Sequence, residues 1–416
     1  MTEHGRGRVA GRVERPAAAE DVQVTAERRH AARALLRSPL LHADGPGADD
    51  LRLVRRHRIE LARMFADGLG YRLVVEPGAA RLFKAGLGRD ATRPLVRKSG
   101  KAFTPRAYAL LCLTLAALTR SKGQLLVDEL VAQVRSAAVD AGLDVDLDAI
   151  ADRRALHAAF AALVELGVLH ERDGDLEHWA EQRTASLLDV RRDRLALLVA
   201  APLAGVEDPD ELLDVAALPS AAGGARVAVR RRLVESPVLS ADELTDEQAE
   251  WWRRGRNRER EWFRDRLGLD LELRAEGAVA LDPEGELSDL EFPGTGSGRR
   301  LALLVLERLT ARLRAGAGEA GPDDRVWRRA DPELVASTSA DVLAEFGAGF
   351  KRDYRDDAAA ALADARAVLV AAGLVRLDPD GAWRVHAAGA RYAVRASITE
   401  GSSGGQRSLF DEEEAP

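Results

Sequence analysis

Cysteine is almost absent from this sequence. Cys112 is the only one in 416 residues, so the chain can form neither an internal disulfide nor a zinc site built from several thiolates. It lies in the apolar run Leu110–Leu113. A reactive thiol needs polar, electropositive surroundings, so we expect Cys112 to be buried in a core.

Long apolar runs are missing as well. No stretch of about 18 uncharged apolar residues occurs, as a membrane-spanning helix would require. Residues 1–25 lack the hydrophobic core of a signal peptide. We therefore expect a cytoplasmic protein that does not enter a membrane.

Aromatic residues and lysine are scarce. Aromatics make up only 5% of the chain while Ala and Leu dominate, which favours helix. Only five of the 61 basic residues are lysines, and the formal net charge is −7. No global positive field therefore draws this protein to nucleic acid or anionic lipid, although local basic patches are compatible with these numbers. The length and the 46% apolar fraction indicate several globular domains.

Motifs of catalysis are also lacking. The stretch Gly294–Gly298 resembles a phosphate-binding loop, but no Gly-Lys-Ser/Thr follows it. The eight histidines are scattered, and His170 and His178 have no third ligand at zinc-like spacing. No nucleophile elbow or metal-binding helix motif occurs. The sequence predicts a protein that is not an enzyme and has no cofactor and no metal site.

An internal duplication organises the chain. Residues 33–73 match residues 231–271 without a gap, with 15 identities in 41 positions. The matched residues include Ser38-Pro39 with Ser236-Pro237, and an Arg-Arg-x-Arg motif that begins at Arg55 and again at Arg253. Such self-similarity predicts two related halves in tandem.

The first half begins with a disordered tail over residues 1–22. A first leader follows over 23–100, with helices at 24–36 and 49–65 and strands at 71–76 and 80–84. Proline ends the first of these helices, because Pro39 disfavours the helical conformation of the residue before it.

A first winged helix is predicted over 101–185. Thr104-Pro105 opens a helix to residue 119, and two more helices follow at 127–138 and 152–166. A hairpin over 168–179 turns at Asp173-Gly174, a strong turn signal. Three helices followed by a two-stranded wing is the order of a winged helix. Residues 186–228 are expected to form one helix (187–200) and a linker.

The second half repeats this plan. A second leader covers 229–295, a second winged helix 296–398 with a wing at 374–385, and a disordered acidic tail 399–416. In each leader and in each winged helix, a glycine is expected to end one helix. These glycines are Gly70, Gly167, Gly268 and Gly373. The predicted fold is mainly α with small β-hairpins (α+β), a tandem winged-helix protein that is internally duplicated. We expect wing-like hairpins four times and full winged helices twice.

The third helix of each winged helix is poorly suited to reading DNA. A helix that enters the major groove presents basic and amide side chains to base edges. The helix at 152–166 is nearly neutral, and the helix at 356–372 is acidic because of Asp356, Asp357 and Asp364. These winged helices are therefore expected to bind protein.

The repeated Arg-Arg-x-Arg motif is a candidate for contacts with DNA phosphates, which guanidinium groups bind well. A solvated helix face paired with Glu60, Glu259 or Glu261, or a salt bridge between the halves, would leave the same pattern. The candidate DNA-contact residues are Arg52, Arg55, Arg56, Arg58, Arg253, Arg254 and Arg256.

Three segments together resemble a bacterial family. They are residues 31–84, Phe103–Leu118 (Phe-Thr-Pro-Arg-Ala-Tyr-Ala-Leu-Leu-Cys-Leu-Thr-Leu-Ala-Ala-Leu) and the Leu166-Gly-Val-Leu wing. The chain resembles the B subunit of Wadjet-type anti-plasmid defence systems, in the branch whose four-gene clusters encode a large SMC-like ATPase. The resemblance covers roughly residues 30–395.

The resemblance implies a kite protein, similar to MukE and MksE. Such subunits form homodimers and bind the kleisin that bridges the SMC heads. The complex is expected to extrude DNA loops with ATP hydrolysed by the SMC partner, and a companion toprim-type nuclease then cleaves small circular DNA. This chain would be a non-catalytic subunit that restricts plasmids and adds non-specific DNA contacts.

Two alternatives remain at this stage. A kleisin-like subunit would bind the ATPase directly with its two ends. A winged-helix transcription regulator would bind one short duplex far more tightly than random DNA.

Overall fold

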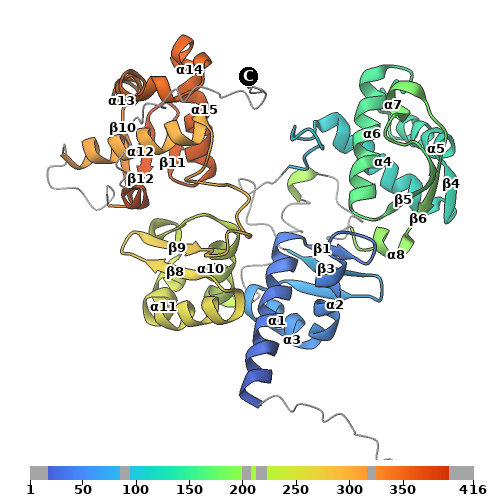
Figure 1. Ribbon diagram of the computed structural model, residues 1–416, viewed down its shortest axis with the longest axis horizontal. Helices are drawn as coiled ribbons and strands as arrows, with labels where there is room; N and C mark the ends of the chain where they lie inside the picture. Colours follow the sequence, from blue (N-terminus) through green and yellow to red (C-terminus); the bar gives the residue numbers. More distant parts are fainter. Residues whose placement is uncertain (1–16, 85–93, 199–207, 212–222, 316–324, 393–416) are drawn as a thin grey trace, which may run out of the picture. The chain divides into compact units, whose positions relative to one another are not determined.

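The computed structural model describes residues 17–84, 94–198, 208–211, 223–315 and 325–392 (Figure 1). These residues are mainly helical, with small antiparallel three-stranded sheets, which confirms the predicted fold class. The chain divides into two compact units. The first contains Met1–Leu239, Leu244–Leu273 and Ala278–Leu287, and the second contains Ser240–Glu243, Arg274–Gly277 and Ser288–Pro416.

The first leader consists of three helices and a three-stranded sheet. Its elements are α1 (Ala17–Arg37), β1 (Leu40–His42), α2 (Ala48–Arg56), α3 (Arg58–Leu69), β2 (Arg72–Val75) and β3 (Ala79–Phe83). The strand order in the antiparallel sheet is β1-β3-β2.

The first winged helix has the same plan. Its elements are α4 (Pro105–Arg120), β4 (Gln124–Leu126), α5 (Val127–Asp140), α6 (Ile150–Glu165), β5 (Leu169–Gly174), α7 (Trp179–Gln182) and β6 (Ser186–Val190). The strand order is β4-β6-β5, and the short helix α8 (Arg192–Leu195) follows.

The second leader repeats the first with its second and third helices joined. Its elements are α10 (Gly224–Glu235), β7 (Leu239–Ser240), the short helix η1 (Ala241–Glu243), α11 (Asp246–Leu267), β8 (Asp270–Leu273) and β9 (Gly277–Leu281). The strand order is β7-β9-β8.

The second winged helix lies in the second unit. Its elements are α12 (Ser297–Ala315), β10 (Trp327–Ala330), α13 (Pro332–Phe346), η3 (Gly347–Gly349), α14 (Arg352–Asp356), α15 (Ala358–Ala371), β11 (Val375–Leu377), β12 (Trp383–His386) and η4 (Ala387–Arg391). The strand order is β10-β12-β11. As expected, Gly294–Gly296 is a loop that leads into a helix, and Ser297 and Gly298 are the first residues of that helix, α12.

Within the described residues the winged-helix order therefore occurs four times, with the second and third helices joined in the second leader, where two full winged helices were expected. Each leader carries the strand that completes the pattern, β1 in the first and β7 in the second. These strands have three and two residues, too few for an alternating pattern to show in the sequence.

The four helix-ending glycines are confirmed. Gly70, Gly167, Gly268 and Gly373 have φ angles of 68°, 68°, 69° and 67°, in the left-handed region that favours glycine. In each case the next residue's amide donates back to a carbonyl in the last turns of the helix, as Val168 N donates to Leu163 O at 2.9 Å. This is the geometry of a glycine C-terminal cap.

The wing of the first winged helix differs from the prediction. Asp173 and Gly174 lie inside β5, and Trp179 begins the inserted helix α7 instead of ending a strand. The second strand of the wing is β6, in a segment predicted as helix 187–200. Burial of Ser186, Leu188 and Val190 shows the period of two that a strand requires, which helix-favouring Leu and Arg residues obscure.

Three helix boundaries also differ. The tail predicted for residues 1–22 is helical from Ala17 onward, and residues 1–16 lie outside the described part, as does the acidic tail. The helix predicted over 49–65 breaks at His57, where α2 ends and α3 begins. Helix α10 starts at Gly224, inside the predicted linker.

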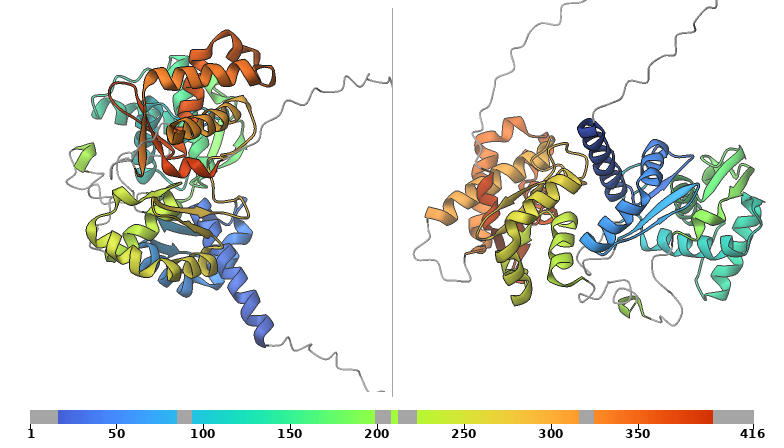
Figure 2. Two further views of the ribbon diagram at one scale, coloured as in Figure 1. Left: turned by 90° about the vertical axis from the view of Figure 1, so that its left-hand side faces the viewer. Right: turned by 90° about the horizontal axis from the view of Figure 1, so that it is seen from below.

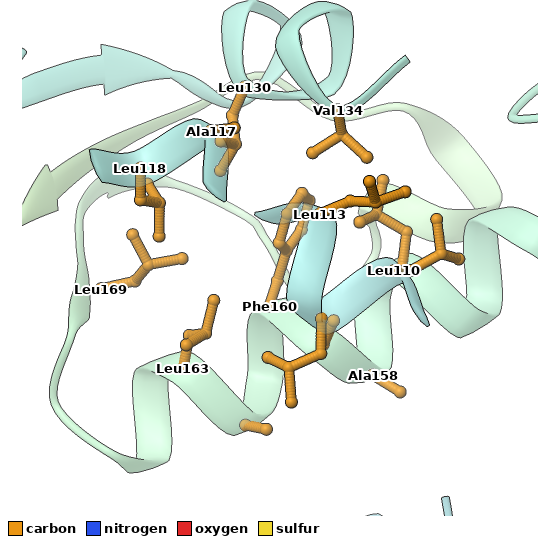
Figure 3. Close-up of a cluster of buried hydrophobic side chains, with 14 of the residues drawn as sticks. Leu110, Leu113, Ala117, Leu118, Leu130, Val134, Ala158, Phe160, Leu163 and Leu169 are labelled. Atoms are coloured by element: carbon orange, nitrogen blue, oxygen red, sulfur yellow. The ribbon is translucent and has the colours of Figure 1, made fainter. Parts of the chain in front are cut away.

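The core of the first winged helix forms where α4, α5, α6 and the sheet meet (Figure 3). Leu110 and Leu113 from α4 pack with Leu130 of α5 and with Phe160 and Leu163 of α6. Cys112 is exposed, so the expectation that it is buried was wrong. It lies between inward-facing neighbours, on the side of α4 that the core does not cover.

Candidate functional site

The two leaders pair with each other inside the first unit. They share one hydrophobic core, to which Leu35, Phe65 and Leu69 contribute from the first leader and Phe263 and Leu267 from the second. Helix α1 packs on α11, and α10 packs on α3 (Figures 1 and 2). Each leader therefore contacts the other through the same two elements, as subunits do in a twofold-symmetric dimer.

Two equivalent arginines make the pairing reciprocal. Arg33 of α1 donates from Nη1 to the carbonyl of Leu267 at 3.1 Å, and Arg231 of α10 donates from Nε to the carbonyl of Leu69 at 3.2 Å. The duplication matches Arg33 with Arg231, and Leu69 with Leu267. Both carbonyls end a helix, where the backbone lacks intrahelical partners. Each leader thus caps the last carbonyl of the other leader's third helix.

The charges around these arginines differ between the two sides. Arg33 lies 2.9 Å from Asp282, with side chains only 3% and 8% exposed, and Arg37 lies 3.3 Å from Glu286. On the other side, Lys84 lies 3.2 Å from the carboxylate of Glu235.

The duplication matches Arg37 with Glu235 and Lys84 with Asp282, so both positions reverse their sign between the leaders. Two copies of one leader would place like charges at these positions. The reversal therefore favours pairing of unlike leaders.

The contact between the leaders buries the apolar faces of their third helices, α3 in the first leader and the C-terminal part of α11 in the second. Phe65 and Leu69 of α3, and Phe263 and Leu267 of α11, are fully buried in the shared core. A winged helix that reads DNA inserts its third helix into the major groove. In the leaders the apolar face of that helix contacts the other leader instead.

The third helix of the first winged helix is covered too. The inserted helix α7 packs on α6, with the rings of Phe160 and Trp179 5.5 Å apart. Arg154 lies 3.0 Å from Glu181, and Arg153 donates to the carbonyl of Ala180 at 2.8 Å. The two arginines of α6 that could reach bases are therefore engaged with α7.

The predicted DNA-contact arginines are all exposed on α2, α3 and α11. Three of them are in ion pairs: Arg52 with Asp49, Arg56 with Glu27 at 2.9 Å, and Arg254 with Glu250. Among the described residues, no carboxylate lies within ion-pair distance of the other four. These four are Arg55, Arg58, Arg253 and Arg256.

Arg56 has a structural partner that the sequence did not suggest. Glu27 of α1 accepts from Arg56 and lies 2.9 Å from Nε2 of the buried His57, where α2 and α3 meet. The hydrogen bonds from His57 and Arg56, with a further one from Gln23, lower the pKa of Glu27 to about 2. This cluster holds α1 against the break between α2 and α3.

A second polar cluster contains Ser240, Asp242 and His386, a residue set that also occurs in hydrolases. Here the amide of Ala388 donates to Nδ1 of His386 at 3.0 Å, so Nε2 carries the proton and donates to Ser240 Oγ, 3.0 Å away. Ser240 in turn donates to Asp242. The imidazole has no lone pair free to accept a proton from Ser240, as a catalytic triad requires.

The described residues hold neither a metal-binding cluster nor a membrane-spanning helix. Across the described ranges, no group of three or more His, Cys, Asp or Glu side chains is arranged to hold a metal ion. Within the same part of the chain, no helix is both long enough and apolar enough to cross a membrane.

Comparison with known proteins identifies the family. The family model described as "Protein of unknown function (DUF2398)" matches residues 32–395. The chain belongs to the DUF2398 family. The matched region begins inside α1 and contains all four of the three-stranded sheets described above. No curated protein matches the sequence significantly.

Sequence reasoning missed one feature of this DUF2398 chain, a groove where the leaders meet. Arg28, Arg63, Arg226 and Arg266 line it together with Trp262. The duplication matches Arg28 with Arg226, five residues before the stretch in which identities were counted. A longer comparison of the halves would have found the pair, but not its position at the contact between leaders.

Proposed function

We propose that this protein is a non-catalytic kite subunit of an SMC-type complex that extrudes DNA loops and restricts plasmids. In this role it binds the kleisin and contributes non-specific DNA contacts. The observation that carries the proposal is the reciprocal pairing of the two leaders through Arg33 and Arg231. Kite proteins with two winged helices work as homodimers. Here one chain contains four winged helices, and its first and third pair as two subunits would.

The pairing changes the expected stoichiometry. A homodimer of two-winged-helix chains provides four winged helices, and this chain provides four by itself. The leaders pair with each other within one chain, and the reversed charges at their contact disfavour pairing of like leaders. We therefore propose that a single chain takes the place that a homodimer has in the family it resembles.

The covered third helices favour a protein-binding role over that of a transcription regulator. Sequence-specific regulators need an exposed third helix with base-reading side chains. In this protein α3 and α11 are packed in the pairing and α6 lies against α7. Helix α15 carries no basic side chain other than Arg366.

Co-purification tests the function. The full-length chain, tagged in its native host and isolated at moderate salt, should bring down an SMC-type ATPase and a kleisin-type protein. Native mass spectrometry should find one copy of this chain at each kleisin, and the ATPase should be lost when the kleisin gene is deleted. Two copies at each kleisin would contradict the single-chain arrangement. Direct binding to the ATPase without the kleisin would contradict the kite role.

Charge reversal tests the DNA contacts. Changing Arg55, Arg58, Arg253 and Arg256 together to Glu should weaken binding of the purified complex to random duplex DNA. Because each phosphate contact contributes about 0.9 to the slope of log K against log salt, the slope should fall by about 3–4 if all four make contacts. The measurement is fluorescence anisotropy over a range of salt concentrations.

A matched set of exposed arginines serves as the control for this experiment. Arg120, Arg191, Arg314 and Arg366 give the same change of net charge elsewhere on the protein. Their reversal should leave the slope within about one of the wild-type value. Equal effects of the two sets would mean that net charge, and no local contact, sets the affinity.

A further inference from the structure

A groove of about 400 Å³ lies where the two leaders meet, between α1, α3, α10 and α11. Arg28 and Arg226 occupy equivalent positions in the two leaders, as do Met64 and Trp262. The groove therefore surrounds the axis that relates the leaders. It exists only because they pair, and its volume is within the usual range of ligand sites.

The floor of the groove is apolar and rigid. Trp262 packs against α3 at Gly68, where a Cβ atom would lie 2.6 Å from the indole ring, so only glycine fits. The guanidinium of Arg230 lies over the same ring, 4.1 Å from its centroid. Arg230 is held by two hydrogen bonds to the buried carboxylate of Glu259, so the indole packs against two constrained neighbours.

The rim of the groove is positively charged. Four arginines (Arg28, Arg63, Arg226 and Arg266) line it, against the two carboxylates of Glu60 and Asp67, which leaves a formal charge of 4 − 2 = +2. Arg28 is paired with Glu60 at 3.1 Å, and Arg226 donates to the carbonyl of Asp67 at 3.2 Å. Arg63 and Arg266 are exposed, and no carboxylate of the described residues pairs with them. They are free to bind an anionic ligand.

The groove is lined by both arginines and carboxylates, and this lining favours an acidic peptide over a nucleic acid as the ligand. Phosphates in the groove would meet Glu60 and Asp67 as well as the arginines, at a cost from like charges. An acidic peptide with a large apolar side chain would place that side chain on Met64 and Trp262 and its carboxylates beside Arg63 and Arg266. Bidentate carboxylate binding is the geometry that arginine favours.

The protein's own sequence contains a segment of this chemistry. Leu409-Phe410 is followed directly by Asp411-Glu412-Glu413-Glu414, so two large apolar side chains adjoin four carboxylates. The formal charge of −4 over residues 411–414 complements the +2 of the rim. We propose that the groove binds the segment Leu409–Glu414. A segment bound there excludes other acidic peptides, so a partner that uses this groove has to displace it.

The test uses a labelled peptide of residues 405–416 and fluorescence anisotropy. The peptide should bind a chain shortened after residue 398, and should bind the full-length chain about ten-fold more weakly, because the attached segment competes at a high effective concentration. Changing Arg63 and Arg266 together to Glu should weaken binding to the shortened chain at least ten-fold. The changes Phe410→Ser, or Asp411–Glu414 to their amides, should do the same in the peptide.

Two controls separate a local contact from net charge and from misfolding. Arg120→Glu with Arg258→Glu makes the same change of charge at exposed positions outside the groove and should alter the affinity less than two-fold. A peptide with Lys at positions 411–414 should bind the Arg63→Glu, Arg266→Glu chain better than the unaltered one. Equal loss in both double variants, no binding to the shortened chain, or equal affinity for the shortened and full-length chains would overturn the proposal.

Discussion

Replacing Arg33 with Ala should lower the free energy of unfolding of the paired leaders by about 3–5 kcal/mol, as expected when one partner of a buried ion pair is removed. The substitution leaves the Asp282 carboxylate, whose side chain is 8% exposed, without its nearest cation. It also leaves the Leu267 carbonyl at the end of α11 without its donor. Native-state hydrogen exchange, which reports local stability in a protein of several units, is the measurement.

Arg37 provides the matched control, because it lies one turn further along α1 and pairs with Glu286 on the same side. Both side chains of that pair are 41% exposed, so Arg37→Ala should cost at most about 1 kcal/mol. The increase in exchange after Arg33→Ala should include α11 and β9 of the other leader. Equal effects of the two substitutions, or an effect confined to α1, would show that Arg33 does not hold the leaders together.

The duplication and the helix ends were visible in the sequence because they depend on local chemistry. Glycine in the left-handed region ends a helix wherever it occurs, so Gly70, Gly167, Gly268 and Gly373 could be assigned without knowledge of the fold. The Thr104-Pro105 helix start is similar, since the Thr104 hydroxyl accepts from the Ala107 amide.

The missed strands and the misassigned helix have a common cause. Strands β1 and β7 obtain their backbone partners from β3 and β9, which are distant in the sequence, and their own residues carry no pattern. In β6, Leu187 and Leu188 have good helix propensity, yet tertiary pairing with β4 and β5 determines their conformation.

The pairing of the leaders could not be predicted from the sequence, although its two arginines belong to the duplicated residues. Arg33 and Arg231 were among the identities, but an identity does not say which atom a side chain contacts. The informative signal was in the residues that differ. The first leader has Arg37 and Lys84 where the second has Glu235 and Asp282, and this reversal of sign at two matched positions makes the surfaces of the two leaders complementary.

The second unit contains a group whose protonation opposes folding. His386 is 1% exposed, and burial lowers its pKa to about 4. Its Nδ1 accepts the Ala388 amide, so a proton added there would face a donor. Asp242 and Glu276 favour the charged form, whereas Arg376, which lies over the ring of Trp327, disfavours it. The net effect is a lowered pKa, so the imidazole of His386 is neutral in the folded protein at neutral pH.

Stability of the second unit should therefore fall as the pH decreases from about 6.5 to about 4. In this window the unfolded chain binds a proton at His386 and the folded chain does not, so the full contribution is present above pH 6.5. A shift of about 2.5 pH units corresponds to roughly 3 kcal/mol. The measurement is hydrogen exchange of β10 and β12 across this range.

The variant His386→Gln keeps an acceptor for Ala388 and a donor for Ser240 but cannot titrate. Its stability should be nearly independent of pH between 6.5 and 4.5, because Asp380, a carboxyl of this unit whose pKa is lowered by Arg329, keeps its stabilising contribution in this range and loses it only in more acidic solution. His178→Gln is the control. His178 is exposed and its pKa is raised by Asp175, so its replacement should leave the pH dependence of the second unit unchanged. An unaltered slope in His386→Gln would show that another group in the unit, and not this imidazole, binds the proton on unfolding.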